Sequence, residues 1–282
     1  MIPNTLGLPL AVALFFTGIT PAQEVTQSPT PAWVSPIESP APRDDATGPT
    51  ELLLLDMQTN AAVDPVENYI HVVGRVLNQE GVEAKAQLSF SFDPSYQKLI
   101  LHGVTIRRGS EVFDRLDMNG LQVIQREKGL EALQYDGRKT ALCFIEDVRV
   151  GDIVEYSFTR TGTSPVFGKN YHDVFPLQFG EEVRHNYLRL VWPDSRPLNM
   201  QTFGNGEEPK VSTQGANREY TWEQTDVPRA KYEEGAPSWY DAAPYVAVSE
   251  YKDWADVAQW GSDLFEAPGL ASAEVAAIAR EI

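Results

Sequence analysis

The feature that most constrains the fold is an alternation of apolar and polar side chains that recurs in many short segments of the chain. Successive side chains of a β-strand point to opposite faces of the sheet, so this alternation predicts strands with one buried face. Residues 69–78, 97–107, 120–127 and 139–148 are also strand-like. The alternating apolar positions are Leu88, Phe90 and Phe92; Val154, Tyr156 and Phe158; Leu188, Leu190 and Trp192; and Tyr220 with Trp222.

Glycine-containing turns separate these segments, and glycine supplies the positive φ angle that tight hairpins need. Examples are Glu80-Gly81, Arg108-Gly109, Asp136-Gly137 and Gly204-Asn205-Gly206. Helical segments do not alternate with the strands, so we expect a mainly β fold, an antiparallel sandwich or barrel.

The periodicity changes near residue 249. Trp254, Val257, Ala258, Leu264 and Phe265 form one stripe of an amphipathic helix, and Asp253 can cap its first turn. Pro268-Gly269 interrupts the pattern, and a second stripe over 272–282 carries no stop signal before the last residue. We expect residues 249–282 to be a helical extension that begins a second domain.

The N-terminal segment is typical of exported proteins. An apolar run over residues 6–20 is followed by the small residue Ala22, which predicts a signal peptide over 1–22 and a periplasmic or extracellular protein. An uncleaved anchor is the alternative; after cleavage no stable membrane span is expected. Residues 23–50 are rich in Pro, Ser and Thr, which favours a flexible linker.

Charge and composition limit the possible partners. The net charge is −17, which argues against binding of nucleic acid and against an electrostatic hold on anionic lipid. Cys143 is the one cysteine, and no two of the four histidines stand at the i, i+4 spacing of helix metal ligands. We therefore predict no metal-binding and no cofactor-binding residues.

Three stretches carry a family resemblance. Residues 92–112, 144–193 and 236–260 resemble the N-terminal domain of unknown function found upstream of transglutaminase-like domains in exported bacterial proteins. The resemblance implies an immunoglobulin-like β-sandwich over 51–230 and a connector over 231–248. It also implies that 249–282 starts a papain-like domain whose Cys-His-Asp triad lies beyond Ile282, so no catalytic residue is expected in this chain.

For most reactive side chains, the local sequence favours a structural or surface role over a catalytic one. Cys143 stands in an apolar, strand-like run, which predicts a buried thiol rather than a nucleophile. His172-Asp173 follows Tyr171 in a predicted loop, where an interface role is favoured over acid–base chemistry. Three acidic pairs predict solvated surface rather than a glycosidase site: Glu181-Glu182, Glu207-Glu208 and Glu233-Glu234.

Aromatic residues near the predicted domain junction form the best candidate surface. Trp239, Tyr240 and Tyr245 lie near prolines, and the favoured interpretation is that they fasten the connector to the chain's own sandwich. Together with Tyr171 and His172 they could instead dock a partner domain or stack on a sugar. The sequence therefore predicts a non-catalytic accessory domain whose partner is its own downstream transglutaminase-like domain. The alternative is a module that binds cell-wall glycan or protein, and a third possibility is a structural scaffold.

Overall fold

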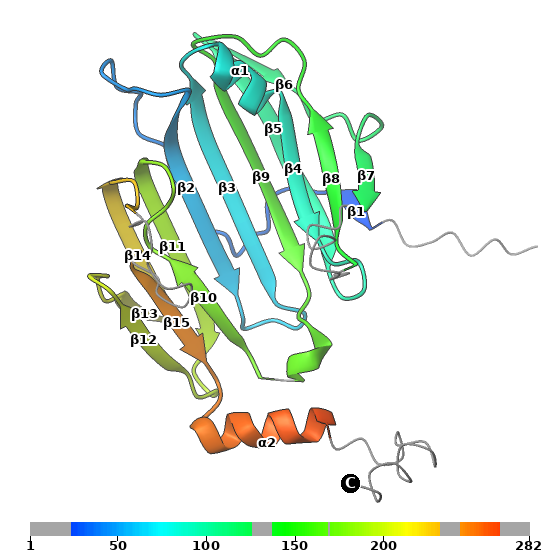
Figure 1. The fold of residues 1–282 in the computed structure, drawn as a ribbon, viewed down its shortest axis with the longest axis vertical. Helices are drawn as coiled ribbons and strands as arrows, with labels where there is room; N and C mark the ends of the chain where they lie inside the picture. Colours follow the sequence, from blue (N-terminus) through cyan, green and yellow to red (C-terminus); the bar gives the residue numbers. More distant parts are fainter. Residues whose placement is uncertain (1–23, 126–136, 169, 232–242, 266–282) are drawn as a thin grey trace, which may run out of the picture.

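The computed structural model describes residues 24–125, 137–168, 170–231 and 243–265, and in these residues the fold is mainly β (Figure 1). A large sheet of nine strands dominates. Along its main path the strand order is β1 (Val25–Gln27), β5 (Lys98–Arg108), β9 (Ile153–Thr161), β3 (Glu67–Val76), β2 (Thr50–Asn60), β11 (Val183–Pro193), β14 (Asn217–Val227) and β13 (Lys210–Gln214), while β6 (Glu111–Asp114) pairs with β5.

Two small antiparallel sheets accompany the large one. The first contains β4 (Gln87–Phe92), β8 (Lys139–Phe144) and β7 (Gln122–Gln125). The second contains β10 (His172–Pro176), β15 (Tyr245–Ser249) and β12 (Asn199–Phe203). The described helices are α1 (Gln79–Lys85), α2 (Trp254–Phe265) and a 3-10 turn over Pro165–Phe167.

The prediction of a purely antiparallel, immunoglobulin-like sandwich is corrected in part. The fold is mainly β, but the large sheet is mixed, because β1 pairs with β5 and β2 pairs with β11 in parallel. The strand pairing and the two small sheets do not form a clear immunoglobulin-like pair of sheets.

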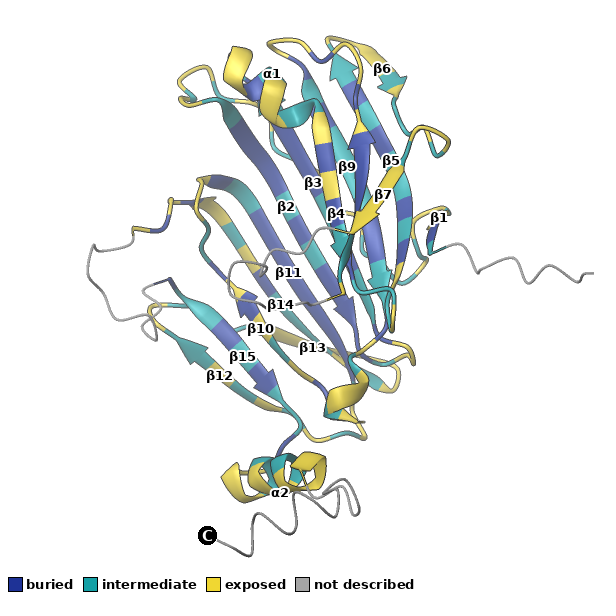
Figure 2. Ribbon diagram, turned by 45° about the vertical axis from the view of Figure 1, so that its right-hand side comes forward, coloured by how far each residue is buried: buried dark blue, intermediate teal, exposed yellow. Residues whose placement is uncertain are grey.

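The register of the large sheet separates two faces. Leu188, Met57, Ile70 and Phe158 stand opposite one another on β11, β2, β3 and β9, so they share one face. Both small sheets pack there, one over the core that contains Phe158 and the other over the core that contains Leu188 (Figure 2). The predicted alternation is confirmed on this face: Leu88, Phe90, Phe92, Leu188, Leu190, Trp192 and Trp222 are all buried.

The opposite face carries polar side chains. Arg189, Gln58, Tyr69 and Thr159 form one row across four neighbouring strands. Gln58 and Thr159 are almost inaccessible to solvent, so this face is covered despite its polarity.

Residues 24–50 provide that cover, and here the prediction of a flexible linker is wrong. We call residues 24–43 the strap. Val25 enters the core through β1, and Ser35 exchanges hydrogen bonds with Gln58, its N–H donating at 3.0 Å and its carbonyl accepting at 2.7 Å. The Trp33 indole donates to Glu67. A Pro-rich segment has too few apolar side chains to form a core of its own. Its backbone N–H and C=O groups can nevertheless form hydrogen bonds with the polar face of a sheet.

Two elements differ from the boundaries expected from sequence. Glu80-Gly81 lies inside α1 rather than in a turn, because the Asn78 side chain accepts a hydrogen bond from the Gly81 N–H at 3.1 Å and caps the helix. Tyr245–Ser249, placed in the predicted connector, is the central strand of a small sheet. The predicted helix α2 is confirmed, with Asp253 accepting from the Asp256 N–H at 3.0 Å; residues 272–282 lie outside the described residues.

Cys143 lies in β8 and is 2% exposed, as the sequence predicts. Burial raises the pKa of its thiol, which disfavours the reactive thiolate. We expect a water-soluble alkylating reagent to label Cys143 slowly until urea unfolds the chain, and Cys143→Ala to cost on the order of 1 kcal/mol of stability. Rapid labelling of the native protein would contradict the buried assignment.

Candidate functional site

The candidate surface lies at the end of the molecule formed by α2 and the small sheet β10–β15–β12 (Figure 1). The sheet is fixed from behind by Trp192, which is 1% exposed and belongs to the core beneath it. The Trp192 indole donates to the Arg196 carbonyl at 3.0 Å, and the Arg196 guanidinium lies 4.4 Å from the indole centroid. This anchoring gives the surface a rigid base.

Tyr171 belongs to this base rather than to the exposed surface. Its ring is buried 5.6 Å from that of Trp192, and its hydroxyl donates to Asp173 at 3.0 Å. Burial raises the pKa of the Tyr171 phenol well above its ordinary value. The Tyr171 N–H donates to Glu250 at 2.6 Å, which connects β10 to the chain just before α2.

His172 and Tyr245 lie nearer the solvent. His172 begins β10 instead of lying in the predicted loop, and its ring meets the edge of Phe167 at 4.0 Å. Tyr245 stacks on Phe203 of β12 at 4.7 Å. Trp239 and Tyr240, the other two predicted residues, lie outside the described residues.

Helix α2 is attached to the 3-10 turn over Pro165–Phe167 through Trp260, a side chain that the sequence interpretation did not single out. The Trp260 indole donates to the Val166 carbonyl at 2.9 Å, and its ring stacks on Phe167 at 5.4 Å. Trp260 also lies 5.9 Å from Tyr251. Its place three residues after Val257, within the apolar stripe, was the available sequence signal.

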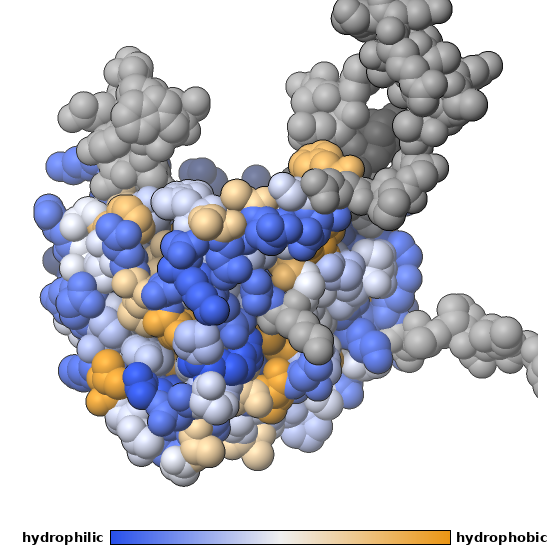
Figure 3. Space-filling model, turned by 90° about the horizontal axis from the view of Figure 1, so that it is seen from below, coloured by the Kyte–Doolittle hydropathy of each residue, from blue (hydrophilic) through white to orange (hydrophobic). Residues whose placement is uncertain are grey.

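A groove of about 460 Å³ runs between this helix and the small sheet. Its apolar wall is formed by Met200, Phe203, Tyr251, Trp254 and Val257. Figure 3, which views this end of the molecule, shows apolar patches among polar side chains.

The apolar side of α2 is left largely uncovered. None of the twelve residues of α2 is buried, and Trp254 and Phe265 are 85% and 90% exposed. Large apolar side chains on a helix that buries none of its residues indicate an interaction surface.

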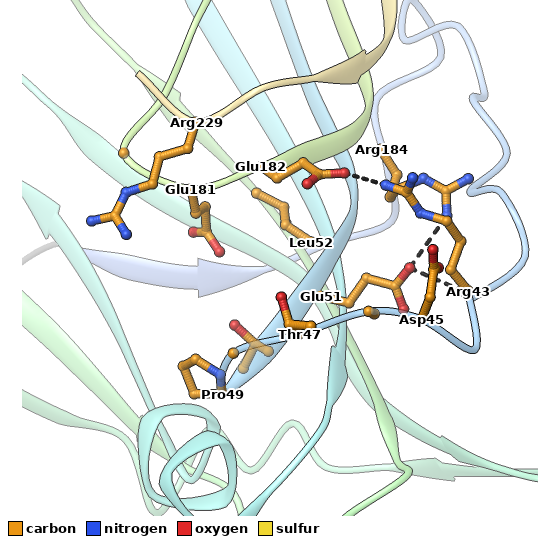
Figure 4. Close-up of a pocket in the computed structure, with 14 residues that line it drawn as sticks. Arg43, Asp45, Thr47, Pro49, Glu51, Leu52, Glu181, Glu182, Arg184 and Arg229 are labelled. Carbon is orange, nitrogen blue, oxygen red and sulfur yellow. Dashed lines mark hydrogen bonds and ion pairs between the residues drawn. The ribbon is translucent and has the colours of Figure 1, made fainter. Parts of the chain in front are cut away.

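A second hollow, of about 490 Å³, lies where the chain enters β2 and β11 (Figure 4). Charged side chains that line it pair with one another. Arg43 contacts Glu182, and Glu51 accepts from the Arg43 N–H at 3.0 Å and from Arg184 at 3.2 Å. These pairs stabilise the seam between the two strands, and we assign no ligand to it. Glu181 and Glu182 are both exposed, as expected for a solvated pair.

Within the described ranges, no group of three or more His, Cys, Asp or Glu side chains could hold a metal ion. Of the helices that the structure describes, none is long and apolar enough to cross a membrane.

Comparison with solved structures shows a likeness in fold. A "putative protease" from Parabacteroides distasonis superposes with a TM-score of 0.68 at 15% identity, over 79% of this chain and 45% of that chain. At this identity the likeness concerns the fold alone, and this chain spans less than half of that protein.

Two Legionella pneumophila structures match more weakly and carry no argument. They are aminopeptidase A in complex with aspartic acid (TM-score 0.39, 11% identity, 73% of this chain and 22% of that chain) and a "putative nutrient binding protein" (TM-score 0.34, 9% identity, 71% and 67%). A search of curated proteins gives no match.

A family model described as "Domain of Unknown Function with solved-structure structure (DUF3857)" matches residues 64–231, which is more than half of the chain. The match covers most of the large sheet and two strands of the sheet beneath the groove. It confirms the resemblance to a domain of unknown function: the chain belongs to the DUF3857 family.

Proposed function

We propose that this chain is a non-catalytic accessory domain of an exported protein, and that its α2 surface docks a transglutaminase-like domain. The observation that carries the proposal is the exposure of Trp254 and Phe265 on a helix without buried residues. An isolated amphipathic helix of twelve residues is only marginally stable in water. A partner that covers the side with Trp254 and Phe265 would therefore stabilise both the helix and the interface.

The position of α2 supports docking of a domain that follows it in the chain. The helix is held at its Trp260 side, while Trp254 and Phe265, near its two ends, remain available. The fold likeness to a protein described as a "putative protease", of which this chain spans 45%, is consistent with a larger assembly of this kind. The acyl-transfer or amide-hydrolysis chemistry of such an assembly would belong to the partner domain.

The alternative, a glycan-binding module, has less support. Stacking on a sugar needs aromatic faces open to solvent. Of the aromatic residues predicted for this role, Tyr171 is buried and Tyr245 stacks on Phe203, while Trp239 and Tyr240 lie outside the described residues.

The test extends the chain into the coding sequence that follows residue 282 and compares hydrogen exchange in α2. We expect strong protection of α2 in the extended protein and its loss in the variant Trp254→Ser/Phe265→Ser, because burial of these two side chains contributes about 3 kcal/mol or more. Val112→Ser is the control. It also changes an exposed apolar residue (65% exposed), but this residue lies on β6, so the protection of α2 should remain intact.

Equal exchange of α2 in the short and extended proteins would overturn the docking role. The purified 282-residue chain should show no amine incorporation and no peptide hydrolysis; turnover that Cys143→Ala abolishes would overturn the non-catalytic assignment.

A further inference from the structure

A cavity of about 310 Å³ lies between the strap and the polar face of the large sheet, away from the α2 surface. The strap contributes the apolar side chains of Val34, Pro36 and Ile37. The sheet contributes polar groups: two carboxylates, an imidazole and two hydroxyls. Small-molecule sites combine apolar walls with a few converging polar groups, and both are present here.

The strand register sets the floor. Asp56 of β2 stands opposite His71 of β3, and His71 stands opposite Ser157 of β9. Glu155 lies two residues before Ser157 and therefore on the same face, and Tyr69 lies two residues before His71. Three adjacent strands thus direct five polar side chains to one cavity.

Asp56 is unusual among the acids of the described residues. Three are buried: Glu51, Asp56 and Asp152. Glu51 pairs with Arg184 at 3.2 Å and Asp152 pairs with Arg108 at 2.7 Å. Asp56 is 1% exposed, and within the described part of the chain it makes no ion pair.

The contacts of Asp56 come from a neutral group. Its two oxygens accept from the Gln58 amide at 3.0 and 3.1 Å, which leaves each oxygen able to accept more. A buried carboxylate without a direct ion pair is unfavourable, although His71, His185 and Arg189 act on it at longer range. Burial raises the pKa of Asp56 to about 6, so at neutral pH most of the carboxylate is still charged.

The other walls of the cavity add acceptors. Glu155 accepts from His71 at 2.9 Å, and this hydrogen bond lowers the pKa of Glu155, so its carboxylate stays ionised. Tyr69 and Ser157 supply hydroxyl oxygens. The described residues include no cluster that could hold a metal ion, so a metal does not match this set of groups.

We propose that this cavity binds the ammonium group of a small primary amine, with the Asp56 carboxylate as its counter-ion. An ammonium carries three donors around a compact charge, and Asp56, Ser157 and Tyr69 offer acceptors for them. The carbon chain of the amine packs beneath Val34 and Ile37 of the strap. The ligand class follows from the cavity and is independent of the α2 surface.

The experiment measures binding of n-butylammonium chloride to the 282-residue protein by NMR titration at pH 7.5, with n-butanol as the neutral probe of equal size. We expect butylammonium to bind at millimolar concentration and butanol at least about tenfold more weakly. Asp56→Asn should weaken butylammonium binding about tenfold or more, while Asp44→Asn, an exposed acid near the end of the strap, should leave it unchanged.

Asp56→Asn retains the size of the side chain and removes a buried charge, so the variant should fold, which its thermal transition verifies. Ser157→Ala is a second variant, expected to weaken binding a few-fold. Affinity should also rise from pH 5 to pH 7 as Asp56 ionises. The titratable and charged groups that face Asp56 are His71 and Tyr69 of β3, His185, Tyr187 and Arg189 of β11, and Glu155 of β9, which lines the same cavity.

Two results would overturn the proposal. One is the absence of any saturable shift in cavity residues with butylammonium. The other is equal binding by the native protein and a folded Asp56→Asn variant, which would show that Asp56 is not the counter-ion.

Discussion

Replacement of Arg189 by methionine is expected to lower the free energy of unfolding by about 3–5 kcal/mol. Arg189 is 4% exposed, and its guanidinium donates to the two oxygens of Glu219 at 3.2 and 2.5 Å. Methionine fills a similar volume but leaves the Glu219 carboxylate, whose side chain is 14% exposed, without its cation. The cost arises mainly from this uncompensated charge.

The same guanidinium fixes the strap. It donates to the Trp33 carbonyl at 2.9 Å and to the Gln58 side chain at 3.1 Å, and Gln58 in turn holds Ser35. Arg189→Met should therefore also increase hydrogen exchange of strap amides such as that of Ser35.

Urea unfolding checks the stability change, and the chain offers a matched control. Arg218→Met removes the exposed pair with Asp194, whose side chains are 46% and 52% exposed, and should change stability by about 1 kcal/mol or less. Adding Glu219→Leu to Arg189→Met should recover part of the loss, since no unpaired charge remains. An Arg189→Met protein as stable as the native one would contradict the importance of the buried pair.

Local alternation predicted strands whose apolar side chains recur at every second position. Residues 87–92 and 188–192 were read correctly because these side chains meet a core; in β11 the intervening Arg189 is buried too, on the face that the strap covers. β2 was missed for the opposite reason. Its run Leu52–Leu55 shows no alternation, since one face meets the core near Val183 and the other meets Ile37 of the strap.

Long-range arrangement could not be predicted from local patterns. The parallel pairing of β2 with β11 joins residues more than a hundred positions apart, and no turn signal records it. The strap was misread because Pro-rich composition shows the lack of core side chains, whereas its attachment depends on Gln58, Glu67 and Arg189 far along the chain.

The candidate surface was predicted in outline only. The sequence singled out Tyr171 and His172 in a predicted loop and Tyr245 in the predicted connector, and the structure brings them to the small sheet beside α2. It could not show that Tyr171 is buried, nor that Phe203 and Trp260 complete the surface, because these contacts depend on the packing of β12 and α2.

Replacement of Trp192 by alanine should likewise lower the free energy of unfolding by about 3–5 kcal/mol, because it empties the core beneath the small sheet. The indole is 1% exposed and contacts Arg196, whose guanidinium pairs with Glu250 just before α2. The loss should therefore also loosen the base on which α2 rests.

Trp254→Ala is the matched control, since it removes the same side chain from a site that is 85% exposed. In the 282-residue chain it should change stability by less than about 0.5 kcal/mol, while in an extended protein with a docked partner domain it should weaken docking. Urea unfolding of both variants, paired with hydrogen exchange of α2, separates the two roles. If Trp254→Ala destabilised the short chain as strongly as Trp192→Ala, the Trp254 indole would already be packed within this domain, and the α2 surface would not be open to a partner.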